Sequence, residues 1–163
     1  MTIHRLGEPD SPFMLDKVRK WTYTRSVGKS GEGAMVATET LVGRVDPKTA
    51  SGPALRTFFK IAERWNLNVE DQMTLLGITA RSTYFKWKGE MDGRLTLDTL
   101  ERISYVFGIF KALNILLPEE EAADAWINKP NDAPMFGGKP ALKRMLSGRV
   151  SDLYVVRQYL DAQ

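Results

Sequence analysis

The chain has 163 residues, of which 43% are hydrophobic, with no cysteine and a single histidine, His4. This composition supports one ordinary domain or two small ones, and it excludes thiol nucleophiles, cysteine-ligated zinc and most histidine-dependent triads. The net charge is +3, with eight basic against six acidic residues over 1–52, seven against five over 53–94, and eight against nine over 95–163. A polyanionic partner is therefore expected to bind before residue 95.

We expect neither a signal peptide nor a membrane-spanning segment. No apolar stretch follows Met1, as a signal peptide would require. The longest apolar segment, Tyr105–Leu117, is shorter than the roughly 18–20 residues that span a bilayer, and Gly108, Lys111 and Asn114 interrupt it. Together with the lack of cysteine, these features predict a cytoplasmic protein that does not bind membranes.

Residues 1–50 show poor periodicity and are assigned to a partly flexible N-terminal extension. The stretch Val27–Ala34 is rich in glycine and polar residues, which is typical of a loop. Gly28–Ser30 reads GKS, but a phosphate-binding Walker A loop needs a glycine five residues before Gly28, where Tyr23 stands. We reject the phosphate-loop interpretation on this spacing.

Regular helical spacing begins near Ser51. Pro53 suits the first position of a helix, because the N–H that proline lacks has no helical partner there. Apolar residues then recur at three- and four-residue intervals up to Trp65. This pattern predicts a helix from Pro53 to Trp65, with Asn66 and Asn68 ending it and capping the next helix.

Two short helices are predicted next, Val69–Leu76 and Ala80–Lys88. Gly77 is expected to adopt a left-handed conformation that closes the first of them, and Thr79 is expected to cap the second. A tight turn at a glycine between two short helices is the pattern of a helix-turn-helix.

The second helix of such a motif presents its first turn to the base edges of the major groove. Arginine bonds bidentately to guanine, and serine or threonine serves bases or phosphates. Thr79–Lys88 carries three basic residues and no acidic one, which suits a phosphate track. We expect the DNA-binding residues to be Thr79, Arg81, Ser82, Thr83, Tyr84, Lys86 and Lys88. Burial in the core is the alternative for Tyr84 and Trp87, and it is favoured for Trp87.

Thr96 is expected to cap a long apolar helix that Pro118 stops, with Gly108 as the point where it would divide in two. A further helix is predicted to begin at Glu119–Glu121, where acidic residues favour the positive end of the helix dipole, and to end before Pro130.

After the loop that follows, a short helix is predicted over Pro140–Leu146, closed near Gly148. Ser151 is expected to cap a last helix, Asp152–Ala162. No segment has a convincing strand pattern, so the predicted class is all-α.

A distinctive set of residues runs through the last third of the chain: Trp126, Pro130–Asn131, Pro134, Phe136–Gly138, Pro140–Ala141, Met145, Leu146, Tyr154, Val156, Tyr159 and Leu160. With these residues, Ala123–Ala162 resembles the toxin-binding domain of the Xre/MbcA/ParS antitoxins. Arg81–Lys88 and Thr99–Leu113 also resemble the Xre members. The likeness covers roughly Pro53–Ala162, and the FGG-x-P-A element is its most specific part.

The resemblance implies an antitoxin that neutralises a RES-domain toxin, which destroys NAD⁺ or uses it for ADP-ribosylation. It also implies repression of the antitoxin's own operon, operator DNA as a partner, a homodimer, and a C-terminal end that blocks cofactor access at the toxin's active site. Tyrosine and arginine are favoured interface anchors. The expected toxin-binding residues are Trp126, Phe136, Gly137, Gly138, Tyr154, Arg157, Tyr159, Leu160 and Gln163.

The predicted organisation is an extension over 1–50, an Xre-like helix-turn-helix domain over 51–117, and a toxin-binding or dimerisation domain over 118–163. The alternative function is a stand-alone dimeric transcription regulator. Within the last domain, the alternative to toxin contact for Leu153 and Leu160 is burial in the core. For Gly137 and Gly138 the alternative is a structural role in a turn. No convergent set of histidines, cysteines or paired carboxylates appears, so we expect no enzyme activity, metal, cofactor or small-molecule substrate.

Overall fold

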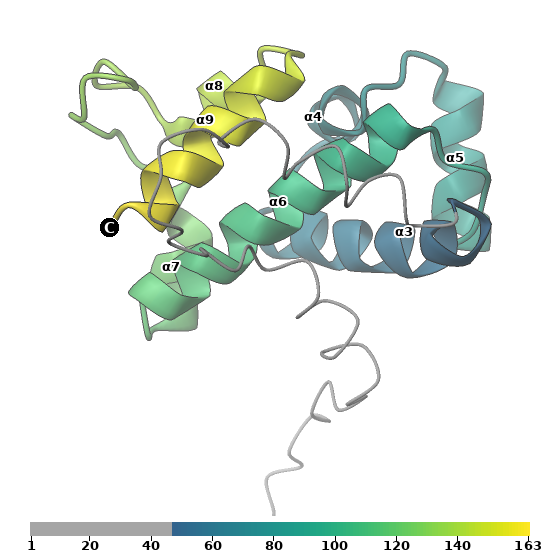
Figure 1. The fold of residues 1–163 in the computed structure, drawn as a ribbon, viewed down its shortest axis with the longest axis horizontal. Helices are drawn as coiled ribbons and strands as arrows, with labels where there is room; N and C mark the ends of the chain where they lie inside the picture. The colour runs from purple at the N-terminus through teal and green to yellow at the C-terminus, as the bar shows by residue number, and fades with distance from the viewer. Residues whose placement is uncertain (1–46) are drawn as a thin grey trace, which may run out of the picture. The chain divides into compact units, whose positions relative to one another are not determined.

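The structure is a computed structural model that describes residues 47–163. The predicted extension up to position 46 lies outside the described residues, including the loop Val27–Ala34 and its GKS segment. The described residues form α3 (Pro47–Arg64), α4 (Val69–Leu76), α5 (Arg81–Glu90), α6 (Leu97–Leu116), α7 (Glu120–Trp126), α8 (Ala141–Met145) and α9 (Val150–Asp161) (Figure 1). The predicted all-α class is confirmed. Over the same residues, no helix has the length and apolar character needed to cross a bilayer.

Helix α3 begins earlier than predicted. It starts at Pro47 and includes Pro53 in its interior, so the predicted start at Pro53 is wrong. The reason lies in packing, since Ser51 is fully buried and its Oγ accepts a hydrogen bond from the Leu95 N–H at 3.2 Å. Within the helix, Thr57 Oγ1 donates to the Pro53 carbonyl at 2.9 Å. The tertiary contact of Ser51 thus holds a helical turn ahead of a residue that usually starts a helix.

The turn between α4 and α5 largely follows the sequence pattern. Asn68 caps α4, with its side chain accepting a hydrogen bond from the Asp71 N–H at 2.8 Å, and Gly77 is left-handed at φ 71°. A Cβ at Gly77 would lie 2.6 Å from Arg102 Nε, so the Arg102 side chain of α6 would have to move to admit one. Thr79 is not the cap of α5: Ala80 takes the extended cap conformation and makes no side-chain cap bond.

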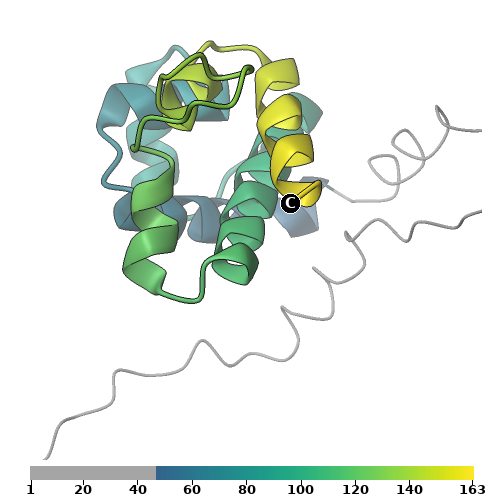
Figure 2. The same ribbon diagram turned by 90° about the vertical axis from the view of Figure 1, so that its left-hand side faces the viewer.

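Helix α6 is continuous through Gly108, so the predicted division there is not observed. Thr96 caps α6 as expected, accepting a hydrogen bond from the Thr99 N–H at 3.1 Å. Gly108 serves the packing of α6 on α9, because a Cβ there would collide with the Arg157 guanidinium. Helix α6 lies alongside α9 and also packs against α3, α4 and α7 (Figure 2).

The last helices are joined by hydrogen-bonded turns. The loop after α7 is closed by an isolated antiparallel bridge between Pro130 and Pro140. Helix α9 begins at Val150 with Arg149 as its cap residue, so the predicted cap at Ser151 is wrong. Ser147 organises this end instead, since its Oγ accepts from the Arg149 N–H at 3.1 Å and donates to Asp152 Oδ2 at 2.7 Å.

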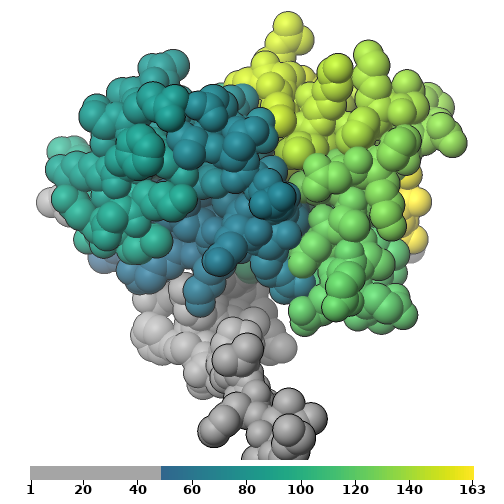
Figure 3. Space-filling view, turned by 180° about the vertical axis from the view of Figure 1, so that it is seen from behind, coloured from purple at the N-terminus to yellow at the C-terminus, as the bar shows by residue number. Residues whose placement is uncertain are grey.

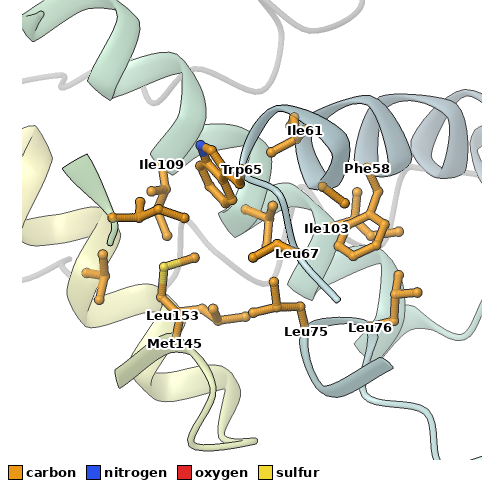
Figure 4. Close-up of a cluster of buried hydrophobic side chains, with 14 of the residues drawn as sticks. Phe58, Ile61, Trp65, Leu67, Leu75, Leu76, Ile103, Ile109, Met145 and Leu153 are labelled. Atoms are coloured by element: carbon orange, nitrogen blue, oxygen red, sulfur yellow. The ribbon is translucent and has the colours of Figure 1, made fainter. Parts of the chain in front are cut away.

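One hydrophobic core joins the described helices (Figure 4). Trp65 and Leu75 belong to the predicted helix-turn-helix segment, whereas Met145 and Leu153 belong to the C-terminal segment, and all four lie in the same buried cluster. Arg102 adds a polar link, because it pairs with Asp98 at 2.8 Å and donates to the Gly148 carbonyl at 3.0 Å. The residues assigned to 51–117 and 118–163 therefore belong to one compact unit.

Candidate functional site

The outward surface of α5 brings together most of the predicted DNA-binding side chains. Thr79, Arg81, Ser82, Lys86 and Lys88 are exposed, Thr83 is half-buried and Tyr84 is buried. We call Arg81, Ser82, Phe85, Lys86, Lys88 and Gly89 the α5 face; all six are exposed on this helix. The face is basic, and Glu90, the last residue of α5, is an exposed carboxylate that follows it.

Tyr84 departs from the expectation for a DNA-binding residue. Its side chain is 0% exposed, and its hydroxyl donates a hydrogen bond to Gln72 Oε1 at 2.7 Å. Gln72 Nε2 in turn donates to the Leu67 carbonyl at 2.7 Å. Tyr84 therefore ties α5 to α4 from within the core, where it satisfies a buried amide. The core position favoured for Trp87 is confirmed.

Two basic side chains of the α5 face are held differently. Arg81 Nη1 lies 2.7 Å from Glu70 Oε1, and both side chains are more than half exposed. Such an exposed ion pair contributes only about 0–1 kcal/mol, so a phosphate or a base could replace Glu70 at small cost. Lys88 Nζ donates to the Tyr84 hydroxyl at 3.3 Å and lies 5.7 Å from the centroid of its ring, so this lysine is held against α5.

Phe85 is a member of the α5 face that the sequence reasoning did not include. Its side chain is 53% exposed. Its exposure could have been predicted from the sequence. Tyr84 and Trp87 are both large aromatic residues suited to a core, and the helical period then places Phe85 on the outward side.

Three of the predicted toxin-binding residues meet in one aromatic cluster, formed by Trp126, Phe136 and Tyr159. The ring centroids of Trp126 and Phe136 lie 6.1 Å apart, those of Trp126 and Tyr159 6.3 Å, and those of Phe136 and Tyr159 5.2 Å. Phe136 is buried, whereas Trp126 and Tyr159 keep part of their surface exposed. The cluster joins α7, the following loop and α9, so it supports the fold as well as offering aromatic surface.

The two glycines after Phe136 form an open, left-handed turn. Gly137 has φ 58° and Gly138 φ 76°, a conformation that residues with a Cβ rarely adopt. Both are exposed, and a Cβ at Gly137 would meet nothing within 4 Å. Arg144 Nη1 braces this loop by donating to the Met135 carbonyl at 2.6 Å. The N–H groups of the two glycines donate to the carbonyls of Ala133 and Asn131. The turn role is therefore sufficient to explain both glycines.

Tyr154 and Arg157 lie on the flank of α9 that faces α6, apart from the aromatic cluster. Tyr154 is 45% exposed, and its ring packs edge-on against Tyr105 at 5.8 Å. Burial, followed by the charge of Glu101, raises the pKa of Tyr105 to about 12, so Tyr105 stays neutral as the donor to Glu101. Arg157 Nε is held by both carboxylate oxygens of Asp161 at 2.8 Å.

The remaining two candidates occupy different environments. Leu160 is buried in the core at 3% exposure, which matches its alternative core role and leaves little of it for a partner. Gln163 is exposed, and its Nε2 donates to the Tyr159 carbonyl at 3.0 Å. The described residues include no cluster of three histidine, aspartate or glutamate side chains placed to hold a metal ion.

Comparisons with known proteins follow this division of the chain. Residues 44–108 match the family model of the antitoxin Xre-like helix-turn-helix domain, and residues 112–163 match that of the antitoxin Xre/MbcA/ParS C-terminal toxin-binding domain. The chain is also similar to the uncharacterized protein y4oB of Sinorhizobium fredii strain NGR234, with 56% identity over 109 residues, covering 67% of this chain and 82% of that protein. Figure 3 shows the two matched segments side by side on one face of the molecule.

Proposed function

Because the chain belongs to the Xre/MbcA/ParS family of antitoxins, we propose that it neutralises a RES-domain, NAD⁺-consuming toxin and represses its own operon in the cytoplasm. The observation that carries this proposal is the union of a helix-turn-helix and a toxin-binding segment on one core. The two candidate surfaces use different helices, so neither has to unfold for the other to bind.

The DNA-binding half of the proposal rests on the α5 face. Its basic side chains suit contacts to phosphates, and Arg81 and Ser82 lie in the first turn of α5, where a recognition helix meets base edges. We also propose that the protein binds its operator as a homodimer, because helix-turn-helix proteins commonly pair two recognition helices on successive turns of DNA.

The toxin-binding half rests on the C-terminal surfaces. Tyr154 offers a large exposed ring, and Trp126 and Tyr159 offer half-buried ones. Partly exposed aromatic residues with firm support are typical anchors at protein interfaces. We propose that they seat the antitoxin over the toxin's active site, so that the NAD⁺ site is covered and the chain itself performs no catalysis.

Co-expression with a RES-domain protein from the neighbouring gene tests the toxin half. We expect the two proteins to co-purify and NAD⁺ consumption by the toxin to fall to background at equimolar antitoxin, while the antitoxin alone consumes none. Unchanged NAD⁺ consumption in the mixture would contradict neutralisation. Sequence-specific DNA binding in the same preparation would then favour the stand-alone regulator.

A gel-shift titration on the duplex upstream of the gene tests the DNA half. Arg81→Ala is expected to lose roughly 1–3 kcal/mol of binding free energy, since it removes a candidate base contact. Lys129→Ala is the matched control, because it removes one exposed positive charge after α7. Equal affinities of the two variants would remove Arg81 from the DNA-binding surface.

A further inference from the structure

We propose that Phe85 reads the C5 methyl group of a thymine in the major groove, so that the α5 face selects sequence through an apolar contact as well as through its basic residues. The inference rests on the proposed DNA binding by α5. It adds a specificity-determining residue to that surface and commits to a chemical group on the DNA.

Phe85 lies near the middle of the exposed side of α5. With 3.6 residues per turn, Ser82, Phe85 and Gly89 share the side of the helix opposite the buried Tyr84 and Trp87. Among the exposed large apolar side chains of the described residues, Phe85 is the one that belongs to α5. A helix that enters a groove with this side would bring the Phe85 ring to the base edges.

The ring is held from behind. Its centroid lies 5.2 Å from that of Tyr84 in an edge-on contact. Tyr84 is itself fixed by its hydrogen bond to Gln72 and by an edge-on contact with Phe59 at 5.9 Å. An exposed aromatic side chain with this support loses little conformational entropy on binding.

Gly89 leaves space beside the ring. It lies one turn after Phe85 on the exposed side of α5, and a Cβ at this position would meet nothing within 4 Å. Glycine inside an exposed helix costs about 1 kcal/mol relative to alanine. The missing side chain allows a base pair to approach the helix backbone next to Phe85.

The surroundings of Phe85 favour DNA over a protein partner. Arg81, Lys86 and Lys88 lie on the same face, and no carboxylate occurs between Thr79 and Lys88. With Glu90 at the end of α5 and Glu70 paired to Arg81, the cations next to Phe85 still outnumber the carboxylates. An isolated apolar group among cations matches the edge of thymine, where the methyl group projects into a groove flanked by phosphates. Phenylalanine is one of the side chains that make this apolar contact.

The test begins with selection of binding sites from a pool of random duplexes, using the full-length protein. Each thymine of the selected duplex is then replaced singly by deoxyuridine, which removes only the C5 methyl group. We expect at least one replacement to weaken binding by about three- to fivefold, as burial of one methyl group would predict. Phe85→Ala should bind the thymine and uracil duplexes equally well.

Leu97→Ala is the matched control, because it removes an exposed apolar side chain outside α5. It should retain the preference for thymine, and thermal unfolding checks that both variants are folded. Enrichment of sites with no thymine-to-uracil effect, or an effect that survives in Phe85→Ala, would overturn the role of Phe85 and leave DNA binding intact. A pool without any enrichment would contradict the DNA binding itself, and the inference with it.

Discussion

The α5 face and the aromatic cluster differ in how their candidate side chains relate to the core. On α5, the polar candidates are exposed, and the buried Tyr84 supports the helix from behind. In the cluster, Trp126, Phe136 and Tyr159 pack on one another and contribute to folding. We therefore expect binding and stability to be separable on the α5 face and coupled in the cluster. Tyr154 combines features of both surfaces, since its large ring is exposed like the α5 side chains and packs against another aromatic ring on one side only.

Phe136→Ala should have the largest effect. It removes a buried ring from the cluster, and truncation of a buried phenylalanine typically costs about 3–5 kcal/mol. We expect a lower free energy of unfolding in urea titrations and loss of toxin binding for that reason. Lys139→Ala, an exposed neighbour in the same loop, serves as the control. A Phe136→Ala protein as stable as the wild type would contradict the proposal that the cluster contributes to both binding and folding.

Tyr154→Ala should lower toxin affinity more than it lowers the stability of the fold. Its contact with Tyr105 is one edge-on pair, so we expect at most about 1 kcal/mol of lost stability. The loss in toxin affinity should be about 2 kcal/mol or more, as for an interface hot spot, when measured by calorimetry. Tyr154→Phe keeps the ring and should retain most of the affinity. Full affinity of Tyr154→Ala would exclude this flank from the toxin interface.

Tyr84→Phe tests whether stability and DNA binding are independent on the α5 face. It leaves Gln72 Oε1 without the donor that now lies 2.7 Å away, and an unsatisfied buried acceptor costs on the order of 1–2 kcal/mol. We expect a lower melting temperature with unchanged DNA affinity, measured well below that temperature. Lost DNA affinity at unchanged stability would return Tyr84 to the DNA-binding surface.

Asp152→Asn should have the smallest effect, and one that depends on pH. The hydrogen bond from Ser147, aided by Arg144, holds the pKa of Asp152 below its usual value. A lowered folded-state pKa adds stability above the unfolded-state value, near 4, and this stability is lost as the pH falls through the folded-state value. The variant should therefore be less stable at pH 7, with the difference closing in acid. A constant difference across a pH series of melts would contradict this.

The helix caps show which features of the fold can be predicted from residues close in sequence. Asn68, Gly77 and Thr96 were predicted correctly, because each acts on backbone groups within three or four residues of itself. The starts of α3, α5 and α9 were not. Ser51 is buried against Leu95, and Ser147 organises the start of α9 from outside the helix. The starts of α3 and α9 therefore depend on contacts that helix propensity does not contain.

The all-α class, the glycine turn of the helix-turn-helix and the likeness to an antitoxin family follow from the amino-acid sequence alone, because helical period, turn chemistry and motif residues are local properties. Which members of each motif remain exposed depends instead on how the helices pack. Tyr84 and Phe85 are neighbours in the chain, yet the packing of α5 buries the first and exposes the second. The reason is physical: burial depends on which other helices lie against a residue, and that is settled when distant segments share one core.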